Sequence, residues 1–260
     1  MRVTAITNRV PTRHRIALLG ALLAAVALAL PVPAASAAAG LPASGTAATT
    51  PVVVPAGLTG TAADYSSIFA DNDPALDGAG WASCSSAITW DVDLGTLDAA
   101  AGQRAIADLQ WAFEQWSQAS GLTFSFAGPA ALTYDDATFT LARADGQPNT
   151  ARHIDIAFVD DSATTRMGGQ TVGLGSPAQV VPTTKEIVSG VAIFRTDHAA
   201  VAGPDEARSL YLHELGHVLG LAHAHDAANV MYPLVSNHVD LGPGDVHGVQ
   251  ALDKPCSATA

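Results

Sequence analysis

Hydrophobic residues along the chain follow two periods, one typical of strands and one typical of helices. Over 87–93 they alternate with polar residues around Trp90, which predicts a half-buried strand. Over 97–119 they recur every three or four residues up to Trp116, and Gly121 follows where a helix C-terminal cap is expected. By the same patterns, we expect further strands at 122–126, 137–142, 153–159 and 190–194 and helices at 204–219 and 245–252.

The order of these elements indicates the fold class. Strands, a helix, more strands and two late helices favour an α+β domain built around one mixed sheet. The helix predicted over 204–219 begins with Pro204, Asp205 and Glu206. The proline suits the first turn of a helix, and the two carboxylates suit its positively polarised end. A glycine-rich segment, 167–175, precedes this helix and the strand before it.

The first 37 residues have the pattern of a secretory signal peptide. A leader with four arginines precedes an apolar run of about 15 residues at 16–30, and Ala35-Ser36-Ala37 offers a cleavage site with small residues. A membrane anchor is the alternative, but the apolar run is shorter than the ~20 residues that a spanning helix needs. We therefore expect a secreted, extracellular protein that keeps no stable membrane anchor after cleavage of residues 1–37.

The composition changes again after this leader. Residues 38–62 contain no charged side chain and are rich in Ala, Thr, Pro and Gly, which predicts a flexible lead-in or short propeptide over 38–80. One folded domain, expected to be a monomer, then covers 81–256. Without the signal peptide the chain carries 8 Lys and Arg against 24 Asp and Glu, a net charge of −16. Such a charge repels nucleic acid, which we exclude as a partner.

Cys84 and Cys256 are the two cysteines of the chain. In an oxidising compartment, an even pair is expected to form a disulfide. Closing so long a loop stabilises the fold by roughly 4–5 kcal/mol in the chain-entropy model. In the alternative, Cys84 would bind a metal as a thiolate, and Cys256 would then be left without a partner.

The stretch HELGHVLGLAH at 213–223 holds three histidines and one carboxylate. On a helix, His213 and His217 lie one above the other, about 5–6 Å apart at Cβ. Both imidazoles can then reach one ion at roughly 2.0–2.1 Å, the zinc–nitrogen distance. Glu214 lies about 100° further round the helix, where it reaches a water on the metal rather than the metal itself. A third ligand must come from elsewhere, so the helix has to end soon after His217.

Gly220 permits that end, because glycine takes the positive φ of a C-terminal cap without a Cβ clash. The chain can then turn and bring His223 beneath the metal. His225 stays open as an alternative, because extended chain alternates its faces and both side chains could point the same way. Asp226 is a candidate hydrogen-bond partner for a ligand imidazole. Gly216, inside the helix, would allow a neighbour to pack closely.

The pattern HExxHxxGxxH, followed by the methionine turn Asn229-Val230-Met231-Tyr232-Pro233, resembles the metzincin clan of zinc endopeptidases. The Met-Tyr-Pro form of the turn, the later segment 244–252 and the strands ITWDVD and IDIAF are most similar to the matrixins, over about residues 85–253. The resemblance implies a metzincin-like zincin fold. It would contain a twisted, mixed five-stranded sheet, two long helices and a C-terminal helix.

The resemblance also implies one catalytic Zn²⁺ with three imidazole ligands, His213, His217 and His223. Its register thus favours His223 over His225. Glu214 would be the catalytic base, and Met231 would lie beneath the metal as a hydrophobic floor. Tyr232 is not assigned to the metal, because the metal-binding tyrosines of the clan come one residue later.

The chain departs from the matrixins at two places. It lacks the propeptide cysteine segment PRCGxPD, so latency through a cysteine is not expected. It also has no histidine-rich loop between Asp160 and Asp197 for a second, structural zinc. Ca²⁺ could bind at Asp160, Asp161 or Asp197, which the sequence leaves open. The other histidines are expected to be ordinary surface or half-buried residues, namely His153, His198, His238 and His247.

These residues predict a secreted zinc metalloendopeptidase with a protein or peptide substrate. Metal-bound water has a pKa of about 7, and Glu214 would remove its proton and later deliver it to the leaving amine. Segment 170–176 would pair with an extended substrate, and 233–241 would form a wall of the pocket. The alternatives are a zinc hydrolase of cell-wall peptide amides and a non-catalytic zinc-containing binding protein. Glu214 argues against the second, since a structural zinc has no need of that carboxylate.

Overall fold

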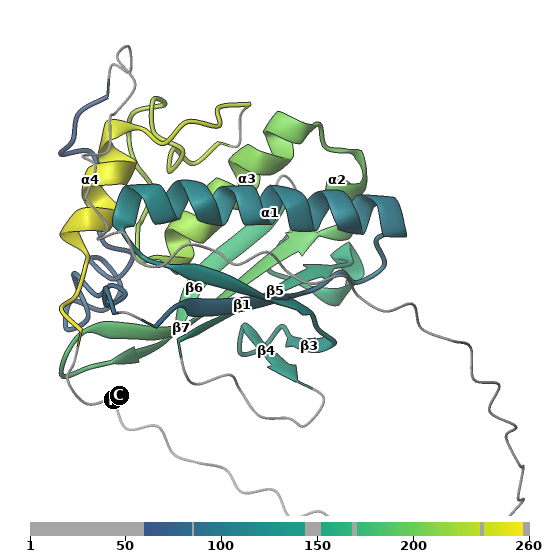
Figure 1. Ribbon diagram of the computed structural model, residues 1–260, viewed down its shortest axis with the longest axis horizontal. Helices are drawn as coiled ribbons and strands as arrows, with labels where there is room; N and C mark the ends of the chain where they lie inside the picture. The colour runs from purple at the N-terminus through teal and green to yellow at the C-terminus, as the bar shows by residue number, and fades with distance from the viewer. Residues whose placement is uncertain (1–59, 85, 144–151, 168–170, 235–236, 257–260) are drawn as a thin grey trace, which may run out of the picture. The chain divides into compact units, whose positions relative to one another are not determined.

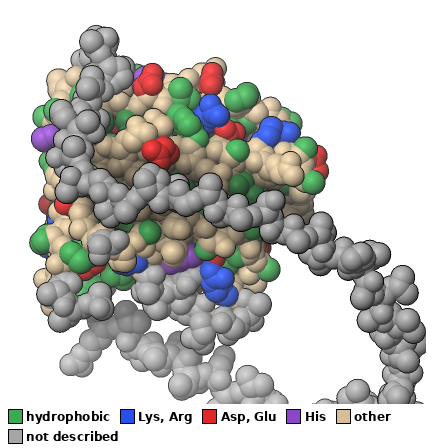
Figure 2. All heavy atoms as spheres, in the orientation of Figure 1, with side chains coloured by type: hydrophobic (Ala, Val, Ile, Leu, Met, Phe, Trp, Pro, Cys, Tyr) green, Lys and Arg blue, Asp and Glu red, His purple; other side chains and the backbone are tan. Residues whose placement is uncertain are grey.

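The structure, a computed structural model, describes residues 60–84, 86–143, 152–167, 171–234 and 237–256. The predicted signal peptide, 1–37, and the first part of the lead-in, 38–59, lie outside the described residues. Among the helices that are described, none is long and apolar enough to cross a membrane. Acidic, basic and apolar side chains are interspersed over the face shown in Figure 2.

A five-stranded sheet forms the centre of the domain. Its strands lie in the order β2–β1–β5–β7–β6, where the first four run parallel and β6 runs antiparallel to β7. They are β1 (Ile88–Asp93), β2 (Phe124–Pro129), β5 (His153–Val159), β6 (Gly173–Val181) and β7 (Glu186–Arg195). The predicted α+β class with one mixed five-stranded sheet is confirmed.

Helices cover one face of this sheet (Figure 1). The two long ones are α1 (Ala99–Ser120) and α3 (Pro204–Val218), and the shorter ones are α2 (Thr196–Val201) and α4 (Pro243–Ala251). The carboxylate of Asp98 accepts the N–H of Ala101 at 2.8 Å where α1 begins, and Gly121 ends the helix with a φ of 77°. The predicted helices are confirmed to within a few residues, whereas α2 was not predicted.

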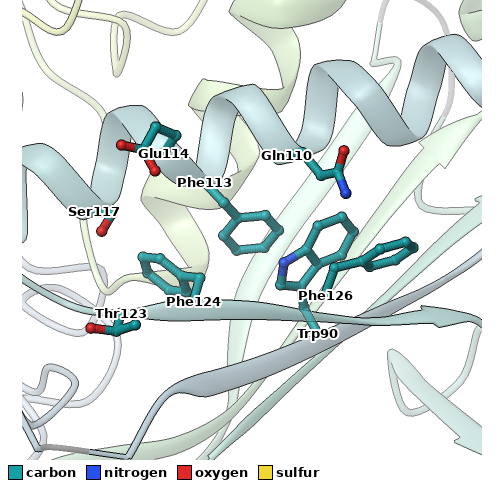
Figure 3. A pocket seen from close by; sticks show the side chains of 8 residues that line it. All are labelled: Trp90, Gln110, Phe113, Glu114, Ser117, Thr123, Phe124 and Phe126. Carbon is teal, nitrogen blue, oxygen red and sulfur yellow. The ribbon is translucent and has the colours of Figure 1, made fainter. Parts of the chain in front are cut away.

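Aromatic rings fill the space between α1 and the strands β1 and β2 (Figure 3). The ring of Trp90 stacks on Phe113 with centroids 4.6 Å apart and contacts Phe126 at 4.2 Å. Trp116, one helical turn after Phe113, is fully buried. The aromatic residues at helical spacing are therefore core residues, as expected.

A two-stranded hairpin, β3 (Leu132–Asp135) and β4 (Thr140–Arg143), covers part of the opposite face of the sheet. The sequence predicted one strand over 137–142, and this was wrong for its first half. Asp135 accepts the N–H of Ala137, and Phe139 has a φ of 55°, so the chain turns at these residues. A short 3₁₀ helix, Asp161–Ala163, follows β5.

Cys84 and Cys256 form a disulfide, as predicted. Beside it, Ala82 forms a parallel bridge with Lys254, so the chain before β1 lies next to the chain after α4. The alternative of a Cys84 thiolate on a metal is thereby excluded.

Candidate metal centre

Two tryptophans from other parts of the fold, Trp116 on α1 and Trp81 before β1, fix the position of the helix α3. Trp116 donates its indole N–H to the carbonyl of Leu212 at 3.0 Å, and Trp81 donates to Val218 at 3.0 Å. Most of the residues between these two points are buried, and they include His213 and Glu214, each 5% exposed. Polar side chains are costly to bury without partners, so their presence on this helix calls for a specific role.

Gly220 reverses the chain at the end of α3, as the sequence predicted. Its φ is +103°, a value that other residues rarely adopt. The backbone N–H of Gly220 donates to the backbone carbonyl of His217 at 3.0 Å. The N–H of Leu221 donates to the carbonyl of Gly216, also at 3.0 Å. These two bonds form a Schellman motif, which ends the helix and turns the chain back along it.

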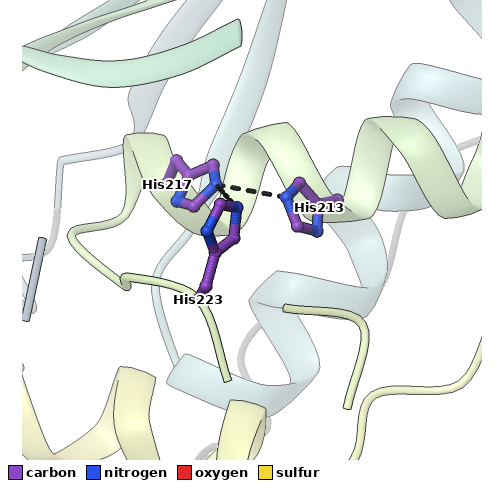
Figure 4. A group of neighbouring side chains, drawn as sticks. All are labelled: His213, His217 and His223. Carbon is purple, nitrogen blue, oxygen red and sulfur yellow. Dashed lines mark hydrogen bonds between the residues drawn. The ribbon is translucent and has the colours of Figure 1, made fainter. Parts of the chain in front are cut away.

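The turn brings three imidazole nitrogens together (Figure 4). Nε2 of His217 lies 3.2 Å from Nε2 of His213 and 3.3 Å from Nε2 of His223. Two ligands at roughly 2.0–2.1 Å from one ion in a tetrahedral arrangement lie about 3.3–3.4 Å apart. Both distances fit two ligands of a single zinc ion, and candidate ligand nitrogens of all three rings lie within 4.8 Å of one another.

The outer nitrogens of two of these rings show which atoms could bind a metal. Nδ1 of His213 lies 2.7 Å from the carbonyl of Val230, and Nδ1 of His217 lies 2.7 Å from the carbonyl of Leu221. A carbonyl can only accept, so each Nδ1 carries the proton and each Nε2 keeps a lone pair. Two lone pairs that face one another at this distance need a cation between them.

Burial also keeps the triad neutral. It lowers the pKa of His213 to about 4 and, together with the charge of His213, that of His217 to about 3. The pKa of His223 is likewise lowered by burial. Neutral imidazole is the form that binds metal ions.

Glu214 lies next to the triad, in contact with the edge strand β6. Burial raises the pKa of its carboxyl to about 8, and a hydrogen bond from the N–H of Gly175 opposes this shift. A Cβ at Gly175 would stand 2.0 Å from the carbonyl oxygen of Glu214, and one at Gly173 would stand 2.9 Å from its Cγ. The glycines of the 167–175 segment thus allow β6 to pass directly over α3.

A cleft of about 760 Å³ runs between β6 and the loop after His223. Glu214 and the three histidines face it, together with Ile68 and Pro233. Of the predicted substrate-pairing segment, 170–176, the described residues 171–175 line the cleft, while residue 170 lies outside the description. Of the predicted wall, 233–241, Pro233 and Leu234 line it, and 235–236 lie outside.

The sequence model of the matrixin family matches residues 80–253. This chain belongs to the matrixin family. Matrixins bind zinc and are peptidases, so the protein is a metallopeptidase, and the family predicted from the motifs is confirmed. A comparison with curated proteins gave no match.

The methionine turn of this matrixin packs directly under α3. A Cβ at Gly216 would stand 2.2 Å from Sδ of Met231, so the close neighbour expected at Gly216 is this methionine. The turn is held from below by Asp245, whose buried carboxylate accepts the N–H of Val230 at 2.7 Å and that of Met231 at 3.2 Å. Asp245 was not predicted as a site residue. Its place in the first turn of a predicted helix was the only available signal.

His225 does not join the triad of this matrixin. Its ring is 97% exposed, and its Nδ1 lies 3.1 Å from the carboxylate of Asp64. The expectation that Asp226 supports a triad imidazole was wrong, since its carboxylate accepts the N–H of Ala228 instead. Backbone carbonyls support two of the three imidazoles, those of His213 and His217.

A second cluster of ionisable groups lies on the other face of the sheet, where it was not expected. His153 was predicted to be a surface or half-buried residue, but it is 4% exposed. Its Nε2 lies 3.3 Å from Asp91 and 3.5 Å from Asp155, and Arg143 contacts Asp91. Burial alone would lower the pKa of His153, but the two carboxylates outweigh it and raise the pKa to about 9. Two cations then balance two carboxylates, which accounts for the burial of the cluster.

The aspartates considered for Ca²⁺ have protein partners. The Arg195 guanidinium contacts Asp197 at 2.5 Å and Asp161 at 3.6 Å, and Asp160 accepts the hydroxyl of Thr96. A calcium site there stays a prediction.

Proposed function

We propose that this matrixin is an exported zinc-dependent endopeptidase, with His213, His217 and His223 as the zinc ligands and Glu214 as the catalytic base. One observation carries the proposal. Three imidazole nitrogens converge at the spacing of zinc ligands, and a buried carboxylate from the same helix faces the same cleft.

The donor set suits zinc better than other divalent ions. Imidazole nitrogens favour Zn²⁺ over the oxygen-seeking Ca²⁺ and Mg²⁺. Three protein ligands leave one position open, as in catalytic sites. When bound, zinc supplies Lewis-acid polarisation of the scissile carbonyl and lowers the pKa of water to about 7.

Glu214 moves the proton in this mechanism. Its carboxylate accepts a proton from the attacking water and passes it to the nitrogen of the departing amine. The N–H of Gly175 orients the carboxylate, which supports a fixed position for this transfer. The water attacks directly, so no covalent acyl-enzyme forms.

The substrate binds as an extended strand along β6. The sheet ends at this strand in the described part of the chain, so the outer edge of β6 can pair with a peptide backbone. Pro233 and Leu234 lie across the cleft from this edge, and Leu234 is 65% exposed. An apolar substrate side chain beside the cleaved bond fits this wall.

Export is supported by the signal-peptide pattern of residues 1–37 and by the Cys84–Cys256 disulfide. Structural disulfides persist in oxidising compartments and are rare in the cytosol.

The test compares wild type with Glu214→Ala for zinc content and for cleavage of casein. We expect the variant to keep its zinc and to lose roughly 10²- to 10⁴-fold in kcat/KM, the usual contribution of a general base. Glu114→Gln, an exposed carboxylate on α1 that accepts from Gln118, is the control and should match the wild type. Equal cleavage by Glu214→Ala would show that the assigned mechanism is wrong.

A parallel panel of cell-wall peptides separates the proposed endopeptidase from a cell-wall amide hydrolase. Cleavage of unstructured proteins supports the proposal. Cleavage of cell-wall peptides alone would show that the protein is a cell-wall amide hydrolase. Binding of proteins or cell-wall peptides without cleavage would leave only the non-catalytic binding protein.

A further inference from the structure

The segment before the family match is attached to the loop that carries His223. We call residues 60–79 the clamp segment. Within it, Ser67 forms an antiparallel bridge with Leu221, and Ser66 accepts the N–H of Ala222 at 2.8 Å. The clamp segment therefore supplies the strand partner of the residues just before His223.

Asp64 binds the same loop on the other side of His223. Its carboxylate accepts the backbone N–H of His225 at 3.0 Å and that of Asp226 at 2.7 Å. It also accepts the side-chain amide of Asn229, at the start of the methionine turn, at 2.9 Å. The side chain of Asp64 is 12% exposed, and its charge makes these hydrogen bonds stronger than bonds to a neutral acceptor.

The fold leaves room for the clamp segment at α4. A Cβ at Gly244 would stand 2.3 Å from the carbonyl oxygen of Asp64, and one at Gly248 would stand 2.8 Å from Cβ of Tyr65. Any larger residue at either position would displace the segment. Two glycines in one nine-residue helix reduce its intrinsic stability. The close packing of the clamp segment explains why glycine stands at both positions.

Ile68 brings the clamp segment to the cleft itself, where it lies with the triad and Glu214. An inhibitory propeptide must leave the cleft without disturbing the catalytic groups. Removal of this segment would instead leave the N–H groups of His225 and Asp226 without the carboxylate that now accepts them.

We propose that the clamp segment stays in the active enzyme and that Asp64 is the positioning residue for the loop carrying His223. The inference rests on the proposed zinc site. It replaces the reading of residues 60–80 as a flexible lead-in or removable propeptide, and it adds Ile68 to the walls of the substrate cleft.

The experiment uses the full chain as wild type, Asp64→Ala, Asp64→Asn and Asp71→Asn. Asp64→Asn keeps one acceptor oxygen, and Asp71 is an exposed acid of the same segment. Three readouts are taken: zinc affinity by competition with a chromophoric chelator, the visible absorption of the Co²⁺-substituted protein, and the N-terminus of the active species by intact mass.

We expect Asp64→Ala to weaken zinc binding roughly 10- to 100-fold, the usual effect of losing a residue that supports a ligand. Asp64→Asn should lose less, Asp71→Asn should match the wild type, and the Co²⁺ spectrum should change only for the Asp64 variants. The active species should begin before Asp64. If Asp64→Ala does not fold, the zinc affinity and spectrum of Asp64→Asn decide the question.

The proposal would be overturned if the Asp64 variants had the same zinc affinity and the same Co²⁺ spectrum as the wild type. A fully active form that begins after Ile68 would also overturn it. In either case the wild type still binds zinc and cleaves protein, so the endopeptidase assignment stands. A wild type without zinc and without proteolysis overturns both.

Discussion

Nδ1 of His213 donates a hydrogen bond to the backbone carbonyl of Val230 at 2.7 Å. The N–H of Val230 in turn donates to the carboxylate of Asp245 at 2.7 Å. A continuous line of hydrogen bonds thus runs from α4 through the methionine turn to the first imidazole of the triad. The orientation of His213 depends on this line, because a carbonyl on Nδ1 directs Nε2 into the cleft.

Replacement of Asp245 with alanine tests this line. The change leaves the buried N–H groups of Val230 and Met231 without an acceptor. We expect the free energy of unfolding in urea to fall by roughly 2–4 kcal/mol. Asp240→Ala, at an exposed position shortly before α4, is the control. An unchanged free energy of unfolding for Asp245→Ala would contradict the structural role of this carboxylate.

Gly216 and Met231 should be energetically coupled. A Cβ at Gly216 would overlap Sδ of Met231 at 2.2 Å, so Gly216→Ala should destabilise the fold by about 1–3 kcal/mol despite the better helix propensity of alanine. In a Met231→Ala background the overlap is removed, and the same change should cost much less. Urea unfolding of the four proteins gives the coupling energy. Additive effects would mean that the two residues do not contact.

The long periodic elements of the fold were predictable from the sequence, because local pattern decides them. The helix around Trp116 and the strand around Trp90 each bury one face, and their periods are visible in the chain. The hydrophobic pattern did not predict β6 as a strand, since Gly173, Gly175 and Pro177 lack the branched or aromatic side chains that mark one. Those glycines are required by the passage over Glu214, a tertiary contact without a local signature.

The triad was predictable for a different reason. His213, His217 and His223 are close in sequence, and Gly220 marks the turn between them. The residues that support the triad come from distant segments. Asp64 reaches His225 across 161 positions, and no spacing rule could have paired them. The burial of His153 was not predicted, because its partner Asp91 lies on another strand. The charge pair that permits this burial has no signal in the local sequence.

The buried His153 should make stability depend on pH. Its pKa in the folded protein is about 9, above the ordinary value of 6.5, because Asp155 and Asp91 face it. The folded state therefore binds the proton more tightly, and this contribution is complete below about pH 6.5 and is lost as pH rises through about 9.

Urea unfolding at pH 6 to 10 checks the effect, with His153→Gln as the comparison. The stability difference between wild type and variant should shrink as pH rises, and Arg143, which also faces Asp91, stays charged throughout. A constant difference across this range would mean that His153 does not carry the proton.

Removal of the Cys84–Cys256 disulfide should lower the stability of the fold but leave zinc binding intact. The bond joins residues 172 positions apart, and the chain-entropy model gives about 4–5 kcal/mol for such a loop. Cys84→Ser/Cys256→Ser should melt at a lower temperature but keep its zinc below that temperature, since the triad lies on α3 and the loop after it. Loss of zinc from the still-folded variant would contradict this separation.

The zinc content of the purified, mature protein tests the central claim most directly. Elemental analysis after dialysis should find one zinc per chain in the wild type and none in His213→Ala/His217→Ala, because the converging imidazoles are the binding site. A folded wild type that contains no zinc, and takes up none when it is supplied in excess, would contradict the account.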